Sequence, residues 1–266
     1  MLRSINDILT YPIEALDGSI GKAKDCLFDD SSWTWRHLVV DTGKWLPGKK
    51  VLVSPFHLDQ PDVGFQKHKI HVKLEKEQIG NSPGLDADAP VSRQYEMELA
   101  HYYNHAPYWL MTDAFHPATP HEIQNTVEDD QNNKSFKRHS KQLKEIEAST
   151  LRSANEVCGY QIDAKDGEFG FIDDLIMEDA NWTLHYVVVS TRKWLPGRKF
   201  LIDIDWIQTF DWKNSLAMVN LDRDGIESSP VYDPEEPINR DYLNNLYDFY
   251  GRPKRDKEPP LAVTPL

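Results

Sequence analysis

The fold of this chain is decided by the stretch TGKWLPGKKVLV at residues 42–53, which returns as TRKWLPGRKFLI at residues 191–202. Outward from it, residues 2–58 pair with residues 151–207 without a gap, and 24 of the 57 paired positions are identical. The similarity resumes after a length change in one loop and continues into a tail that follows each copy. Self-similarity over about a hundred residues indicates a duplicated domain.

Composition limits the class of protein. With 266 residues, of which 39% are hydrophobic and 11% aromatic, the chain can form two small globular domains. The net charge of -13 opposes binding to nucleic acids and to anionic lipid surfaces. No apolar run is long enough to span a membrane, and the first residues lack the apolar core of a signal peptide. We therefore expect a cytoplasmic protein without membrane insertion and without a nucleic-acid partner.

Each copy has the pattern of a small β-rich domain. An Asp-Gly turn, at residues 17–18 and 166–167, predicts an opening hairpin, and the apolar runs at 33–40 and 182–189 predict buried strands. Further short strands at close spacing predict a small barrel. In the tails, apolar residues at helical spacing predict a helix packed on each barrel: Tyr95, Leu99 and Tyr102 in the first, Tyr242, Leu246 and Phe249 in the second.

These patterns give a mainly β fold with short helices, made of two tandem barrels that are each followed by a tail helix. The predicted boundaries are a first barrel at 1–83, its tail helix at 84–108, a polar linker with a possible short helix at 109–150, a second barrel at 151–230, its tail helix at 231–251 and a flexible C-terminus at 252–266. We expect the two copies to pack about a pseudo-two-fold axis.

The residues that are identical in both copies are mostly Gly, Pro, aromatic and aliphatic, so the duplication preserves folding or binding positions rather than catalytic groups. Six ionisable pairs are retained, and for Asp17 and Asp30 we favour capping of a turn over catalysis. The two cysteines, Cys26 and Cys158, align with leucines of the other copy, which predicts packing roles and no disulfide.

The Trp-Leu-Pro-Gly turn between two strands, together with the later Ser-Pro, Arg-x-Tyr and Tyr-Tyr elements, resembles a bacterial PRC-barrel protein with two tandem barrels. The family is named after the cytoplasmic domain of the photosynthetic reaction centre H subunit. The resemblance covers about residues 2–108 and 151–251. It implies small β-barrels used for docking and assembly, and it brings no family-wide catalytic motif. The chain lacks the transmembrane segment of the H subunit, so that specific role does not transfer.

The most specific motif is the repeated turn, Trp45, Leu46, Pro47 and Gly48 in the first copy and Trp194, Leu195, Pro196 and Gly197 in the second. Pro followed by Gly suits a type II turn. A Trp-Leu pair before such a turn is a candidate docking surface for a protein partner. The alternative is that each Trp caps the open end of its own barrel. Further candidate anchors are the tail tyrosines Tyr95, Tyr102, Tyr103, Tyr242 and Tyr250.

Metal and catalytic signatures are weak. His101 and His105 share a helical spacing but lack the Glu of a His-Glu-x-x-His motif, so we predict ordinary histidines there. The run from Asn220 to Gly225 begins like a calcium loop, but Val231 stands where the bidentate Glu is required. We predict no cofactor, no metal and no enzyme activity. The predicted function is a protein-binding adaptor, with a homodimer left open. The alternative is a small-ligand or metal-binding sensor with a site between the two barrels.

Overall fold

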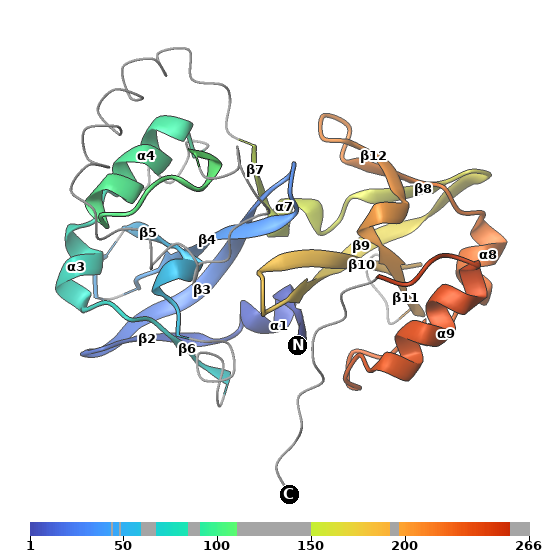
Figure 1. Cartoon of the computed structure of the whole chain (residues 1–266), viewed down its shortest axis with the longest axis horizontal. Coiled ribbons are helices and arrows are strands. Elements are labelled where there is room, and N and C mark those ends of the chain that lie inside the picture. The colour runs from blue at the N-terminus through green and yellow to red at the C-terminus, as the bar shows by residue number, and fades with distance from the viewer. Residues whose placement is uncertain are drawn as a thin grey trace, which may run out of the picture. The chain divides into compact units, whose positions relative to one another are not determined.

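The computed structural model describes residues 1–43, 45–47, 49–59, 68–84, 91–110, 150–191 and 197–255 (Figure 1). The first copy contains β1 (Leu2–Ser4), α1 (Ile5–Ile8), β2 (Pro12–Ala15), β3 (Gly18–Asp29), β4 (Thr34–Asp41), β5 (Lys50–Val53), η1 (Pro55–His57), β6 (Ile70–His71), α3 (Lys76–Asn81), α4 (Arg93–Tyr102) and η3 (Tyr108–Leu110). The second copy contains β7 (Leu151–Ser153), α7 (Ala154–Val157), β8 (Gln161–Ala164), β9 (Gly167–Glu178), β10 (Thr183–Ser190), β11 (Lys199–Asp203), η4 (Ile204–Trp206), β12 (Ile207–Asp211), β13 (Leu216–Val219), α8 (Arg223–Ser228), β14 (Val231–Tyr232) and α9 (Arg240–Tyr250).

The elements of the two copies recur in the same order, as the sequence repeat predicts. The prediction of a mainly β fold is confirmed, and the strands hydrogen-bond into one mixed sheet. The two predicted tail helices are present as α4 and α9. The predicted division of this sheet into two barrels stays an expectation.

The chain divides into two compact units. The C-terminal unit comprises Met1–Thr10, Phe28–Trp35 and Arg152–Leu266, and the N-terminal unit comprises Tyr11–Leu27 and Arg36–Leu151. The first ten residues of the chain therefore belong to the unit that is built mainly from the second copy. Residues 1–83 are divided between both units, whereas residues 151–230 lie in the C-terminal unit except for Leu151. Most of the predicted linker, residues 111–149, lies outside the described residues.

The C-terminal unit is organised around β9. This strand is flanked by β8 and β10, both antiparallel to it, and β1 also pairs with it. Strand β13 runs parallel to β8 and pairs with β12, while β11 pairs with β10 and β14. The long apolar run of β10 is explained by its burial, because the side chains of its last five residues are all buried.

The N-terminal unit repeats this arrangement. Strand β2 is antiparallel to β3 and parallel to β6, and β4 pairs with β5. One apolar cluster consists of Leu27, Val39, Leu52 and Leu99, so that helix α4 packs on the sheet as predicted. Partly buried side chains extend this cluster: Val91, Tyr95, Tyr103 and Leu151.

Close backbone packing explains why a glycine is retained in β3 and β9. A Cβ at Gly21 would lie 2.0 Å from the carbonyl oxygen of Asp41, and one at Gly170 would lie 2.3 Å from that of Ser190. Any side chain would push apart the two paired strands of each copy. The retained glycine is therefore a packing requirement in both copies.

The retained aspartate of the opening hairpin was predicted to cap its own turn, and the structure shows it capping the start of a later short helix. The carboxylate of Asp17 accepts the backbone N–H of Lys76 at 2.9 Å, and that of Asp166 accepts the backbone N–H of Arg223 at 2.8 Å. Both N–H groups are the first of a short helix and have no partner within it. In contrast, Asp30 forms an ion pair with Arg152. Both cysteines are free, and Cys26 is buried, as predicted.

Candidate functional site

The turn that contains Trp45 is held by hydrogen bonds from both sides. The hydroxyl of Thr42 is 2.7 Å from the carbonyl oxygens of both Leu46 and Lys49, and the N–H of Lys49 donates to Leu46 at 3.1 Å. The ammonium group of Lys49 donates to the carbonyl of Gly80, at 2.6 Å, near the end of α3. The turn is therefore fixed to the body of the N-terminal unit, and its apolar side chains are held in place.

Trp45 lines an open pocket of about 430 Å³ in the N-terminal unit. The pocket is also lined by Pro12 and by Ile20, whose side chain is fully buried. Lys22 and Asp41 are exposed and give the pocket one positive and one negative charge. The remaining lining residues belong to β3 and to the segment after β4, and they include Gly21 and Gly43. This combination suits a short peptide segment better than a purely apolar ligand.

The other residues of the predicted docking turns are placed unequally. Leu46 is partly buried and Pro47 is exposed, so only part of the motif faces solvent. In the second copy Gly197 is partly buried. The remaining members, Gly48, Trp194, Leu195 and Pro196, lie outside the described residues.

The five predicted tail tyrosines mostly attach the tail helices to their own units. The hydroxyl of Tyr95 donates to the carbonyl of Pro83 at 2.9 Å, and that of Tyr242 donates to Pro230 at 3.2 Å. Tyr103 and Tyr250 are partly buried, and Tyr250 packs its ring 4.8 Å from that of Trp206. Tyr102 is exposed, and its hydroxyl donates to the carbonyl of Gln78. The structure does not gather these tyrosines around the Trp45 pocket.

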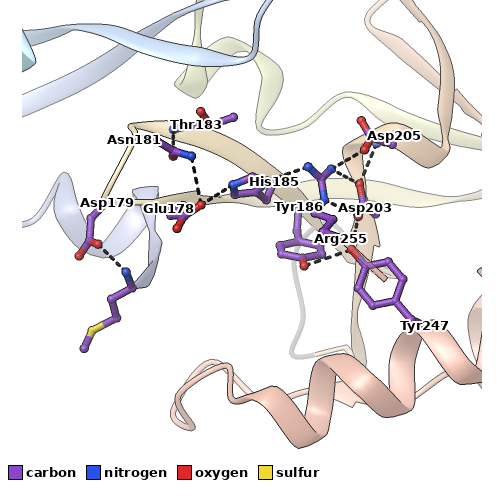
Figure 2. A network of polar contacts seen from close by, with 11 residues as sticks. Glu178, Asp179, Asn181, Thr183, His185, Tyr186, Asp203, Asp205, Tyr247 and Arg255 are labelled. Atoms are coloured by element: carbon purple, nitrogen blue, oxygen red, sulfur yellow. Dashed lines mark hydrogen bonds and ion pairs between the residues drawn. The ribbon is translucent and has the colours of Figure 1, made fainter. Parts of the chain in front are cut away.

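A network of charged side chains in the C-terminal unit was not predicted (Figure 2). Its centre is Arg255, which lies after α9. The guanidinium group makes two hydrogen bonds to the carboxylate of Asp203, lies 2.9 Å from Asp205, and donates to Nδ1 of His185 at 2.8 Å. The Nε2 atom of His185 lies 2.9 Å from the carboxylate of Glu178. Because Nδ1 faces a guanidinium donor, it must act as an acceptor, and Nε2 then donates to Glu178.

Two tyrosines complete this network. The hydroxyl of Tyr247 donates to Asp203 and lies 3.2 Å from the hydroxyl of Tyr186. Burial and the nearby charge of Asp203 raise the pKa of Tyr247 well above its ordinary value. The carboxylate of Asp203 is thus engaged by Arg255 and Tyr247. The network attaches residues 252–255, which the sequence predicted as flexible, to β11 and η4. Residues 256–266 lie outside the described residues.

A histidine cluster lies in the N-terminal unit. The rings of His57 and His105 are 5.8 Å apart, and the ring of Tyr103 is 4.4 Å from that of His57. Burial and the neighbouring His105, Lys73 and His37 lower the pKa of His57 from 6.5 to about 3. The Nε2 atoms of both His57 and His105 are buried without a hydrogen-bond partner. Buried orphan nitrogens of this kind require a physical explanation.

The histidine cluster was missed because its members are distant in sequence. The helical spacing pairs His105 with His101, and both were predicted to be ordinary histidines; His101 is exposed on α4 and does not belong to the cluster. One feature of the sequence could have pointed to His57: the equivalent position in the second copy is Trp206, so the histidine is specific to the first copy. Within the described residues, no three His, Cys, Asp or Glu side chains are gathered so that they could hold one metal ion.

Comparison with known proteins adds no relative. No family model matches the chain, and no curated protein matches it. In the part of the chain that the structure describes, no helix is both long and apolar enough to cross a membrane.

Proposed function

We propose that this chain is a non-catalytic protein-binding adaptor built from duplicated PRC-like barrels, and that the Trp45 pocket is one of its docking surfaces. The observation that carries the proposal is the indole of Trp45 beside an open pocket with an apolar floor and opposite charges at its rim. Tryptophan is enriched among the residues that dominate the free energy of protein interfaces. Since the turn is hydrogen-bonded to α3, the indole needs little reordering on binding, which lowers the entropic cost.

The ligand that this pocket favours is an extended protein segment. Such a segment can place an apolar side chain against Trp45 and Pro12, and its own charges can meet Lys22 and Asp41. The absence of a catalytic role is part of this proposal.

The test compares proteins captured from the native host by the wild type and by three variants. Trp45→Ala removes the indole, Lys22→Glu reverses an exposed charge at the rim without touching the core, and Phe249→Ala removes an exposed aromatic ring of α9 as a control. We expect one partner to be lost from both pocket variants and kept by Phe249→Ala. The same captured proteins from all four baits would refute docking at this pocket.

A second candidate function is a metal-binding sensor, and it is favoured by the histidine cluster. The Nδ1 atom of His105 is 3.2 Å from the carbonyl oxygen of Ala106, so Nδ1 carries the proton and Nε2 keeps its lone pair. In metal-binding histidines, the ring nitrogen that does not bind the metal commonly donates to a backbone carbonyl in this way. This candidate needs ligands beyond His57 and His105, because no set of three is gathered among the described residues.

Metal titration distinguishes this candidate from the adaptor. Zn²⁺, Ni²⁺ and Co²⁺ are added to the wild type and to His57→Phe while the thermal unfolding midpoint is measured. A ligand that binds only the folded state raises the midpoint. An increase that His57→Phe abolishes would support the sensor, whereas equal midpoints with and without each ion would exclude it.

A further inference from the structure

The N-terminal segment of the chain is bound by the second copy rather than by its own. We call residues 2–8 the first arm. Its strand β1 pairs antiparallel with β9, with Arg3 opposite Met177. The guanidinium group of Arg3 forms an ion pair with Asp179 at 2.5 Å. Beyond the strand, the side chains of Ile5 and Ile8 are fully buried in the C-terminal unit.

The carboxylate of Asp174 fixes the start of α1. It accepts a hydrogen bond from the hydroxyl of Ser4 and another from the backbone N–H of Asn6, at 3.0 Å. The side-chain amide of Asn6 donates to the carbonyl of Asp173 at 2.8 Å. The first arm is therefore held by a strand pairing, an ion pair and a capped helical turn at once.

The corresponding segment of the second copy makes the reciprocal contacts. We call residues 151–157 the second arm. Its strand β7 pairs with β3 of the first copy. The guanidinium group of Arg152 lies 2.7 Å from the carboxylate of Asp30 and 4.4 Å from the ring centroid of Trp212. Arg152 and Asp30 are the sequence equivalents of Arg3 and Asp179, so each copy supplies the arginine of one ion pair and the aspartate of the other.

A third reciprocal contact lies between the Trp-Thr dipeptides of the two copies. Thr34 pairs with Thr183, the N–H of Trp35 donates to the carbonyl of Trp182, and the N–H of Leu184 donates to the carbonyl of Trp33, both at 2.7 Å. Each bond has its counterpart with the copies exchanged. Contacts in which residue i meets j and the equivalent of j meets the equivalent of i define a self-complementary interface.

We propose that this junction is a dimer interface made internal by duplication, and that the partner it fits is another copy of the same repeat. The recognition element is an arm of sequence Leu-Arg-Ser followed by a helical turn that begins with an apolar residue. The receiving element is a β3-type or β9-type strand together with the retained aspartate that follows it, Asp30 or Asp179. Recognition occurs by strand addition, with the arginine and the buried apolar residues giving specificity. The inference does not depend on the adaptor role or on the Trp45 pocket.

The first test uses the full chain with a specific protease site inserted between residues 129 and 130. After folding and cleavage, we expect the two pieces to elute together as a one-to-one complex in size-exclusion chromatography with light-scattering detection. When two cleaved samples with different affinity tags are mixed, pieces carrying different tags should assemble into hybrid complexes. Pieces that separate on cleavage under native conditions would overturn the proposal.

A second test examines the specificity of the arms in the same cleavable chain. Reversing both arginines, Arg3→Asp with Arg152→Asp, should weaken the association of the two pieces by at least about 100-fold, because each change places like charges together. Adding Asp179→Arg and Asp30→Arg should restore most of it.

The control for the reversal is Lys165→Asp, which makes the same change of charge at an exposed residue outside the arms. It should leave the association as in the wild type. Equal weakening by the control, or no recovery in the four-residue variant, would show that the arm ion pairs do not specify the junction.

Discussion

The histidine cluster predicts that acid destabilises the N-terminal unit. The pKa of His57 is lowered from 6.5 to about 3, mainly by burial and then by the charges of His105, Lys73 and His37. Burial also lowers the pKa of His105. For a group whose folded pKa is depressed, the unfolded chain binds more protons as the pH falls below the unfolded value. The stability of this unit should therefore decrease below pH 6.5 and continue to decrease down to about pH 3.

The size of the effect follows from the two pKa values. At pH 5 the unfolded His57 is almost fully protonated, whereas the folded one is almost fully neutral, and the difference costs about 2 kcal/mol. A free-energy difference of this size changes the equilibrium constant between the folded and the unfolded form of this unit by about 30-fold. The perturbation is His57→Phe, which keeps a ring beside Tyr103 but cannot take up a proton. This variant should lose about 2 kcal/mol less stability than the wild type between pH 7 and pH 5.

The C-terminal unit provides an internal contrast of opposite sign. Burial raises the pKa of Asp174 from 3.8 to about 6, despite the hydrogen bonds that the carboxylate accepts from Ser4, Asn6 and Leu175. A raised folded pKa means that the folded state binds more protons as the pH falls. Between pH 7 and pH 5 this carboxyl group should stabilise its unit by about 1 kcal/mol.

The assay is native-state hydrogen exchange followed by mass spectrometry, with rates corrected for the intrinsic effect of pH. Peptides from α4 report on the N-terminal unit, and peptides from α9 report on the C-terminal unit. Exposed His101 is replaced by Phe as a control for the loss of a histidine from α4. If His57→Phe and the wild type lost the same protection in α4 on acidification, the explanation based on the buried imidazole would be refuted.

Two further predictions concern stability. Arg255→Ala should lower the free energy of unfolding in urea by about 3–5 kcal/mol, because the side chain of Asp203 is only 2% exposed and would lose its guanidinium partner. Adding Asp203→Ser, which introduces the residue of the first copy, should recover part of that loss. A loss below about 1 kcal/mol for Arg255→Ala alone would contradict the role of Arg255 as the partner of a buried carboxylate. Gly170→Ala should destabilise by more than about 2 kcal/mol, because its Cβ would lie 2.3 Å from the carbonyl oxygen of Ser190. The control Gly225→Ala, in α8 with open space around it, should be neutral or slightly stabilising, and equal unfolding midpoints for both variants would disprove the packing argument.

Local features of the sequence predicted local structure well. The repeat itself, the Asp-Gly hairpins and the tail helices all depend on residues close together in the chain. Such features are fixed by backbone geometry and short-range hydrogen bonds, which a pattern can reveal. The histidine cluster and the Arg255 network escaped prediction because their members come from separate elements and lie in one copy only.

The sequence by itself determined that two copies of one fold are present and which residues each copy must keep. It could not determine which copy each arm would join. Because Asp30 and Asp179 are the same residue in the same setting, Arg3 finds an equivalent acceptor in either copy, and the pattern is equally consistent with both pairings. Only the tertiary structure shows that the arms are exchanged between the copies, so that Arg3 binds Asp179 and Arg152 binds Asp30. The physical reason is that a duplicated chain offers identical local interactions at both sites, so the choice depends on how the long-range strand pairing closes.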